Sequence, residues 1–289
     1  MPFADPASVS RRSFIKTASG ALAAACLPGA LGFRPPAAPA NIPVGMQLYC
    51  VRHELEHDMP GVLASLAEMG FEGVEFADYF GRSAAELRSM LDDHGLRCCG
   101  THIYMDDMLG DKLEPTVAFN KTLGNEYLIV RWLQEPQRAT RDAFMKTVEN
   151  FNEIAENLKP HGLRVGYHNH DYIFKTFGDE TLWDILGDHT SEDVVMQLDT
   201  GNASVVPGVD VVELIKRHPG RTVSMHVKPF STQKPDAFLG DDELDWPQIL
   251  DLAESIGGIE WYIVEYERPA YPPLEALKAN LENLHKFGR

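Results

Sequence analysis

Basic residues are few in this chain of 289 residues. Lys and Arg number 26 against 43 Asp and Glu, which gives a net charge of −17 at pH 7. Proteins that bind nucleic acid or an anionic membrane surface do so through clustered positive charge. The acidic balance therefore argues against nucleic acid and against anionic membranes as partners.

Cysteine is scarce as well, with only Cys26, Cys50, Cys98 and Cys99. A disulfide framework or a cysteine-ligated zinc site needs cysteines in regularly spaced pairs, so the sequence predicts neither. Cys98 and Cys99 are adjacent and would face opposite sides of a strand. The turn after the first predicted strand carries no G-x-G-x-x-G and no G-x-x-x-x-G-K-[ST] motif, which argues against dinucleotide and P-loop nucleotide sites.

A membrane-spanning hydrophobic run is absent too. The mildly apolar stretch 17–33 is too short and too rich in Ala and Gly to form a stable anchor, so we expect no stable membrane insertion. Residues 10–16 read Ser-Arg-Arg-Ser-Phe-Ile-Lys, and this pattern resembles a twin-arginine export signal. The resemblance implies the twin-arginine export machinery as a partner and a periplasmic or secreted protein.

Ala38-Pro39-Ala40 supplies a small-x-small cleavage pattern. We therefore predict two regions: a twin-arginine signal peptide with a short linker over 1–40, and the mature protein over 41–289. A lipid anchor on Cys26 is less favoured, because Ala23 is a poor match to a lipobox. Without residues 1–40 the chain keeps 22 basic and 42 acidic residues, a net charge of −20 over 249 residues.

The mature chain alternates short apolar runs with amphipathic stretches, the pattern of βα units around a buried parallel sheet. The predicted strands are 44–49, 73–77, 97–102, 127–132, 164–168, 194–199, 222–227 and 261–266. Eight units in 249 residues predict an α/β fold, a single-domain (β/α)8 TIM barrel, with an open doubly wound sheet as the alternative.

Two helices carry recognisable end signals. Ser83 with Glu86 forms a capping box, and Gly95 stands where a glycine ends that helix. Thr140 begins a helix whose apolar residues recur at three- and four-residue spacing up to Pro160. These signals predict helices between the second and third strands and between the fourth and fifth.

Polar residues close the four late strands, where a TIM barrel builds its site. His168, Asp199, His226 and Glu265 are 31, 27 and 39 residues apart, about one βα unit per step. Two imidazoles and two carboxylates suit Mn²⁺, Co²⁺, Fe²⁺ or Zn²⁺ better than Ca²⁺ or Mg²⁺. The sequence therefore predicts one divalent metal at these residues, although Asp199 is equally well placed to cap the helix that follows it.

Several motifs resemble the xylose isomerase-like barrel superfamily of sugar isomerases and epimerases. They are Gly45-Met-Gln-Leu-Tyr49, Gly73-Val-Glu-Phe76, Gly166-Tyr-His-Asn-His170, Gln197-Leu-Asp-Thr-Gly-Asn202, Met225-His-Val-Lys228 and Val264-Glu-Tyr-Glu267. The resemblance implies a divalent metal, most often manganese, on residues that map to His168, Asp199, His226 and Glu265. Many members carry Glu at the position of His168. The histidine of this chain resembles an inosose dehydratase-like branch instead, so a two-glutamate proton shuttle does not carry over directly.

A metal bound to a carbonyl oxygen and its neighbouring hydroxyl acidifies the carbon between them, and a base then forms a metal-stabilised enediolate. Glu265 is the first candidate for this catalytic base, and His170 is the second. Lys228 lies two residues after His226 and is placed to stabilise oxyanion charge, with an ordinary lysine at a loop edge as the alternative.

Earlier strands supply candidates for substrate binding. Glu75 alternates with apolar neighbours and should point into the barrel, where it would position a substrate hydroxyl or pair with a buried cation. His102 closes the third strand. Tyr49, Trp132 and Phe230 would form a stacking wall for a sugar ring or, alternatively, ordinary packing.

Together these features predict a metal-dependent sugar or polyol isomerase or epimerase. A metal-dependent dehydratase or lyase, acting on an inosose or a 3-keto-glycoside by β-elimination, is the second hypothesis, and a noncatalytic carbohydrate-binding barrel is the third. An exported enzyme would seldom meet phosphorylated sugars, so we expect an unphosphorylated substrate and leave a homo-oligomer open. The DNA-repair endonucleases of this fold need a basic surface, which this chain does not offer.

Overall fold

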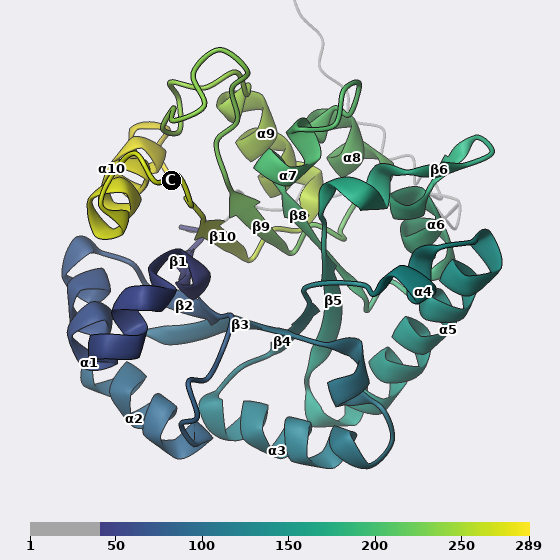
Figure 1. Ribbon diagram of the computed structural model, residues 1–289, viewed down its shortest axis with the longest axis horizontal. Helices are drawn as coiled ribbons and strands as arrows, with labels where there is room; N and C mark the ends of the chain where they lie inside the picture. Colours follow the sequence, from purple (N-terminus) through teal and green to yellow (C-terminus); the bar gives the residue numbers. More distant parts are fainter. Residues whose placement is uncertain (1–40) are drawn as a thin grey trace, which may run out of the picture. The chain divides into compact units, whose positions relative to one another are not determined.

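The computed structural model describes residues 41–289, and the predicted export signal and Cys26 lie outside this range. Eight parallel strands close into a barrel in the order β1-β10-β9-β8-β5-β4-β3-β2 (Figure 1). They are β1 (Val44–Gln47), β2 (Gly73–Phe76), β3 (Arg97–Ile103), β4 (Tyr127–Val130), β5 (Arg164–His168), β8 (Val195–Asp199), β9 (Ser224–Val227) and β10 (Trp261–Val264). The pairing of β1 with β10 confirms the TIM barrel and excludes the open sheet.

All eight predicted strands are present, but β1, β2, β4 and β10 end one or two residues earlier than the sequence indicated. β1 stops at Gln47, and Tyr49 lies in the following 3-10 turn η1 (Leu48–Val51). β4 stops at Val130, which leaves Trp132 in the loop beyond it. A small antiparallel hairpin of β6 (Thr176–Phe177) and β7 (Glu180–Thr181) lies outside the barrel and was not predicted.

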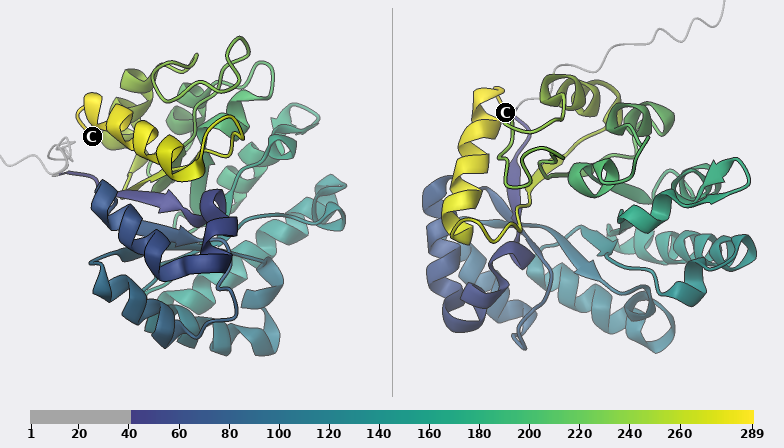
Figure 2. Two further views of the ribbon diagram at one scale, coloured as in Figure 1. Left: turned by 60° about the vertical axis from the view of Figure 1, so that its left-hand side comes forward. Right: turned by 45° about the horizontal axis from the view of Figure 1, so that its top comes forward.

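Helices form the outer layer around the barrel (Figures 1 and 2). They are α1 (Arg52–Met69), α2 (Ala84–Asp93), α3 (Leu113–Leu123), α4 (Glu135–Arg138), α5 (Arg141–Leu158), α6 (Leu182–His189), α7 (Thr200–Ser204), α8 (Val211–Arg217), α9 (Trp246–Leu252) and α10 (Pro273–Lys286). Short 3-10 turns η2 (Met105–Met108), η3 (Gly110–Lys112), η4 (Lys159–His161) and η5 (Asp171–Phe174), and the π-helical turn η6 (Ala253–Gly257), complete the connections.

The predicted helix ends are confirmed. Ser83 and Glu86 bond reciprocally in a capping box at the start of α2, and Gly95 has a φ of 66° just beyond its end. The Thr140 side chain accepts from the Ala143 amide at the start of α5. Local capping chemistry therefore decides these boundaries.

The buried apolar side chains form two clusters. The larger lies between the strands and the helical layer and includes Cys98. The smaller, with Cys99, Ile129, Val195 and Ile263, fills the barrel interior. Cys98 and Cys99 thus belong to opposite faces of β3, as predicted, and every cysteine among residues 41–289 is free and buried.

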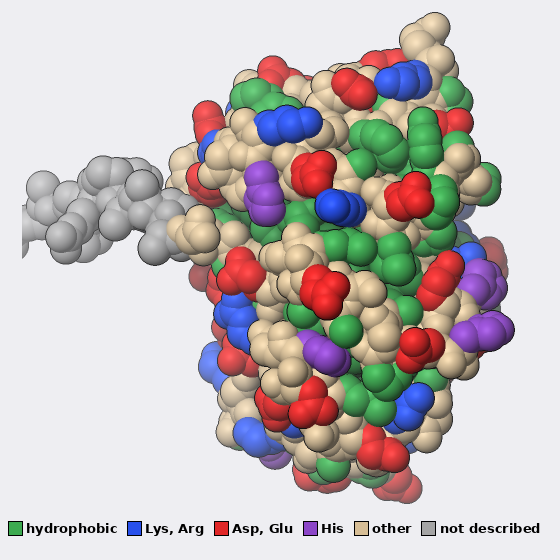
Figure 3. All heavy atoms as spheres, turned by 90° about the vertical axis from the view of Figure 1, so that its left-hand side faces the viewer, with side chains coloured by type: hydrophobic (Ala, Val, Ile, Leu, Met, Phe, Trp, Pro, Cys, Tyr) green, Lys and Arg blue, Asp and Glu red, His purple; other side chains and the backbone are tan. Residues whose placement is uncertain are grey.

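Charged side chains of both signs lie on the surface of the molecule (Figure 3). Figure 3 shows acidic and basic side chains intermixed over one face of the molecule. Within residues 41–289, no helix combines the length and apolarity required to cross a bilayer.

Candidate metal centre

His168, Asp199, His226 and Glu265 come together at the C-terminal ends of four neighbouring strands. His168 ends β5, Asp199 ends β8, His226 lies in β9 and Glu265 follows β10 directly. The barrel register places Asp199 beside His226, which puts both side chains on one face. All four residues are buried, and one ligand atom from each lies within 4.8 Å of the others.

Asp199 uses its two oxygens differently. Oδ1 accepts from the Asn202 amide at 2.7 Å and caps α7, whereas buried Oδ2 has no hydrogen-bond partner among the described residues. Oδ2 lies 3.7 Å from His168 Nε2 and 3.5 Å from Lys228 Nζ. Burial raises the pKa of Asp199 to about 6, against the opposing charge of Lys228. A buried carboxylate oxygen that accepts no hydrogen bond and lies near the Lys228 ammonium fits a position beside a bound cation.

His168 is held as a neutral ring with one nitrogen available. Its Nδ1 lies 3.0 Å from Gln197 Oε1, and the Gln197 amide nitrogen donates to Glu75 and Ser224. We therefore assign the proton to His168 Nδ1, which leaves the Nε2 lone pair toward the cluster. Burial lowers the pKa of His168 well below its usual value, so the ring is in the form that binds metals.

His226 lies between two carboxylates. Nε2 is 2.6 Å from Glu75 Oε2, and Nδ1 makes a short hydrogen bond to Glu265 Oε2. Burial alone would lower the pKa of His226, but the charges of Glu75 and Glu265 outweigh it and raise the pKa to about 10. Both nitrogens are thus protonated and bonded to carboxylates, so a metal at this residue would replace the proton that Nδ1 shares with Glu265 while Glu75 holds Nε2. The donor set therefore fits a divalent metal.

Glu75 lies behind this cluster as a fully buried anion. Gln47 Nε2 and Gln197 Nε2 donate to it at 2.6 and 2.7 Å, and His102 Nε2 lies 3.0 Å away. Burial would raise the pKa of Glu75, but the charges of His102 and His226 hold it well below the usual range. Of the two predicted roles, the geometry matches pairing with a buried cation, because the carboxylate has no exposed surface.

The Glu75 carboxylate occupies space beside Gly100 of the neighbouring strand β3. A Cβ at Gly100 would lie 2.6 Å from Glu75 Oε1, so a side chain there would collide with the carboxylate. Because Gly100 of β3 has no side chain, the Glu75 carboxylate fits inside the barrel.

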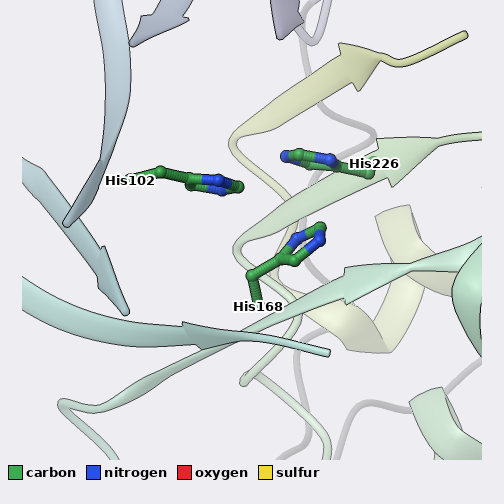
Figure 4. A group of neighbouring side chains, drawn as sticks. All are labelled: His102, His168 and His226. Carbon is green, nitrogen blue, oxygen red and sulfur yellow. The ribbon is translucent and has the colours of Figure 1, made fainter. Parts of the chain in front are cut away.

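His102 joins the same network from β3. Its Nε2 lies 2.9 Å from Gln197 Oε1, and its ring stacks on His226 with centroids 5.4 Å apart. Figure 4 shows the rings of His102, His168 and His226 reaching one point from three different strands. These three histidines form a second group with metal-ligand spacing.

A cavity of about 470 Å³ opens over the cluster, and we call it the metal-side cavity. Its lining includes the predicted site residues His102, His168, His170, Lys228 and Glu265. It also includes Tyr49, Tyr104 and Trp132, which are 45%, 43% and 38% exposed. These are three of the five exposed large hydrophobic side chains of residues 41–289, so such side chains gather at this cavity. Phe230 is not among its lining residues.

Lys228 is a central member of the cluster. Its Nζ lies 2.5 Å from Glu265 Oε1, 3.2 Å from Glu267 Oε2 and 3.2 Å from Asn202 Oδ1. Burial alone would lower the pKa of Lys228, but Asp199, Glu265 and Glu267 raise it above its usual range. Lys228 thus lies at the edge of the loop after β9, and its largely buried side chain brings the ammonium beside the candidate base.

His170 lines the metal-side cavity at its aromatic side. Its ring meets Trp132 edge-on at 4.9 Å and stacks on Tyr172 at 5.8 Å. Burial, with help from His102 and Lys228, lowers the pKa of His170 to about 4. The ring is therefore neutral near pH 7, and its buried Nδ1 has no hydrogen-bond partner within the described part of the chain.

A profile of the family described as "Xylose isomerase-like TIM barrel" matches residues 63–287. The chain belongs to the xylose isomerase-like TIM barrel family. This assignment agrees with the resemblance seen in its strand-end motifs.

Several named proteins and solved structures are similar to this family member. It is 25% identical to the rhizopine catabolism protein MocC of Rhizobium meliloti, over 81% of this chain and 83% of that protein. It is 23% identical to the inosose dehydratase of Erwinia tasmaniensis, over 78% and 88%. A sugar phosphate isomerase/epimerase structure from Parabacteroides distasonis shares 25% identity and a TM-score of 0.73, over 86% and 94%. A D-allulose 3-epimerase from Methylomonas sp., at 13% identity and a TM-score of 0.62 over 87% and 99%, shares the fold.

Sequence reasoning missed the polar residues that support the cluster in this family member. Gln47 donates to Glu75, and Gln197 bonds Glu75, His168 and His102. Ser224 accepts from the Gln197 amide nitrogen inside the barrel. One signal was available: Gln197 precedes Asp199 by two residues and so shares its face of β8. Asn202 accepts a hydrogen bond from Lys228, and the only sequence signal for it was its position in the Gln197–Asn202 motif.

Proposed function

We propose that the protein is a divalent-metal-dependent enzyme acting on a sugar or polyol. It removes a proton from the carbon next to a carbonyl and returns one to the resulting enediolate, giving an isomer or an epimer. The observation that carries this proposal is the buried His168, Asp199, His226 and Glu265 cluster, with its unpartnered Asp199 oxygen, at the base of a cavity. A bound metal, Mn²⁺ by preference and otherwise Co²⁺, Fe²⁺ or Zn²⁺, supplies the Lewis acid that polarises the carbonyl.

Glu265 is the proposed base. Burial would raise the pKa of Glu265, but Lys228 and His226 hold it well below the usual value, so the group is a carboxylate. Its Oε2 bonds His226, whereas Oε1 faces Lys228 and the residue lines the metal-side cavity. Oε2 is thus bonded to the ligand set, and Oε1, which accepts from Lys228, keeps a second lone pair that can take a proton from bound substrate.

Lys228 and His170 take different parts in this scheme. The Lys228 ammonium donates hydrogen bonds to charge that develops on a substrate oxygen. Neutral His170 is the second candidate for proton transfer, with Nδ1 unpartnered. Tyr49 and Trp132 supply exposed ring faces against which a sugar can stack. Because the predicted destination lies outside the cytoplasm, we propose an unphosphorylated substrate.

The position of Lys228 favours elimination as a second candidate reaction. Glu265 Oε1 and Lys228 Nζ are 2.5 Å apart, so base and acid lie on one side of the cavity. In elimination, Glu265 takes the proton next to the carbonyl, the C–O bond on the following carbon breaks, and the departing oxygen takes a proton from Lys228. The similarity to a protein named inosose dehydratase supports this alternative.

Proton exchange tests the proposal. Metal-loaded protein is incubated in D₂O with ketohexoses, inososes and 3-keto-glucosides, and products are followed by mass spectrometry and NMR. We expect deuterium at the carbon next to the carbonyl, whereas an unsaturated product would favour elimination. Glu265→Gln should slow exchange by about 10²- to 10⁴-fold.

The matched control is Glu275→Gln, an exposed residue on α10 that should leave exchange unchanged. Exchange at the full rate in Glu265→Gln would overturn the assignment of the base. Sugar binding by the metal-loaded protein without exchange or product would favour a noncatalytic carbohydrate-binding barrel.

A further inference from the structure

A second cavity adjoins the metal-side cavity, and we call it the outer cavity. Its volume is about 620 Å³, and Ala77, His102, Tyr104 and Arg131 line both cavities. Most of the remaining lining comes from the loop after β2 and from α3, and Ile103 of β3 and Asp107 of η2 complete it. Small-molecule sites have volumes of roughly 300 to 1,000 Å³, so each cavity is large enough to hold a ligand unit of its own.

The outer cavity combines aromatic surface with polar groups. Tyr79 and Phe119 pack with ring centroids 4.3 Å apart, and both line the cavity. Asp78 and Asn120 add carboxylate and amide groups to the same lining. A sugar ring presents apolar C–H faces and a hydroxyl rim, which suits aromatic surface next to hydrogen-bonding side chains.

Two arginines in this lining have N–H donors that are not used in hydrogen bonds among residues 41–289. Arg82 Nε is buried without a hydrogen-bond partner in the described range 41–289. Arg131 lies over the Tyr104 ring at 4.3 Å, and its Nη1 donates to the Ala77 carbonyl at 2.7 Å. Within that same range neither guanidinium lies within 4.0 Å of a carboxylate. In a chain with net charge −17, unpaired guanidinium groups beside a cavity point to acceptors on a ligand.

The loop that carries Arg82 has an unusual backbone. Phe80 has a φ of 52°, and its amide donates to Asp78 Oδ1 at 2.6 Å. The Arg82 amide then bonds the Tyr79 carbonyl at 3.0 Å. A non-glycine residue at positive φ persists only where its surroundings fix it, and such residues cluster at ligand sites. This turn therefore holds Asp78 and Arg82 at the cavity.

We infer that the outer cavity binds a second sugar unit, so that the substrate is a glycoside whose reacting keto-sugar ring lies in the metal-side cavity. This inference rests on the proposed function for the reacting ring alone. The glycosidic link passes along Tyr104 and Arg131, which belong to both cavities. The substrate class is thereby a disaccharide-type glycoside rather than a free monosaccharide.

The test compares two substrates that share one reacting ring. Metal-loaded protein is given methyl 3-keto-glucoside and the corresponding glucosyl 3-keto-glucoside, and kcat/KM is measured for each. We expect the glucosyl compound to be preferred at least tenfold, which equals about 1.4 kcal/mol. Thr116→Trp, which fills the outer cavity, and Arg82→Met, which removes its free donors, should each bring the ratio to about one.

Ala118→Trp is the matched control, because it adds the same bulk to an exposed site on α3 outside both cavities and should keep the wild-type ratio. Equal use of both substrates by the wild type, or an unchanged ratio in both cavity variants, overturns the inference. If neither compound exchanges deuterium, the proposed function fails for this class, and equilibrium binding decides the outer cavity. A tenfold tighter binding of the glucosyl compound, lost in Arg82→Met, then supports the second sugar site, and equal binding refutes it.

Discussion

Asp199 shows how one side chain serves both a helix and a candidate metal. Oδ1 caps α7 through the Asn202 amide, and buried Oδ2 has no hydrogen-bond partner among the described residues. Asparagine keeps an oxygen for the cap but loses the negative charge, whereas alanine loses both. The two substitutions therefore separate the structural role from the ligand role.

We expect Asp199→Asn to lose most bound metal while the metal-free protein keeps its stability to within about 1 kcal/mol. Asp199→Ala should lose the metal and about 1 kcal/mol more, because the N-cap is lost. Metal analysis by mass spectrometry and urea unfolding in chelator measure the two effects. Full metal content in Asp199→Asn would contradict the ligand assignment.

Glu75 offers a second prediction at this scale. Removing one partner of a buried ion pair commonly costs about 3 to 5 kcal/mol, so Glu75→Gln should destabilise the metal-free protein by that order. Glu72→Gln is the matched control, because Glu72 pairs with Arg97 at 3.4 Å on the surface and should cost less than about 1 kcal/mol. If both variants lose the same free energy of unfolding in urea, the buried Glu75–His226 pair contributes no more to stability than the surface pair.

The sequence indicated which strands carry the site but not how its side chains bond. His168, Asp199, His226 and Glu265 could be found because each lies at the end of an apolar strand, one βα unit from the next. The bond from Glu75 to His226 joins residues 151 positions apart, and it depends on barrel register and rotamers that no local pattern encodes. Arg82 was missed for a similar reason, since only the folded loop shows its free donor.

Helix ends were the most predictable elements, because capping is local chemistry. The capping box of Ser83 and Glu86 involves residues three positions apart. The bend in α1 was not predicted: Asp58 leaves helical geometry with a φ of −149°, and its side chain accepts from the Gly61 amide at 3.0 Å just after Pro60. A proline within an apolar pattern shows where a helix can break, and the surrounding packing decides whether it does.

The cap at α2 can be tested with two serines of one helix. Ser83→Ala removes the N-cap and should cost about 1 kcal/mol. Ser89→Ala lies at an exposed interior position, where alanine is the better helix former, and should be neutral or slightly stabilising. Opposite signs in urea unfolding are expected, and equal effects would contradict the role of the cap.

At the scale of the molecule, a bound metal should stabilise the fold, because four strands contribute to its site. With free Mn²⁺ at 1,000 times its Kd, binding adds about 4 kcal/mol, which for a domain of this size is roughly 8 to 16 °C in Tm. We expect EDTA to remove this increment from the wild type and to leave Asp199→Asn unchanged. Calorimetry with and without chelator measures it, and an equal response of both proteins would contradict the site.

We also propose that residues 1–40 direct export. Replacing Arg11 and Arg12 by lysine removes the arginine pair on which the resemblance to a twin-arginine signal depends, and it keeps the positive charge. The expected outcome is retention of the full-length protein in the cytoplasm, measured by fractionation against the unchanged chain. Export of the double-lysine variant at the same level would contradict a twin-arginine route.

The barrel closes by pairing its first strand with its last. The last strand also delivers Glu265, so ring closure and completion of the candidate site await the same late segment of the chain. During synthesis from the N-terminus, a nascent chain can do neither until residue 265 has been made. Metal uptake at these four residues therefore reports on complete folding, and a truncated or stalled product would bind no metal there.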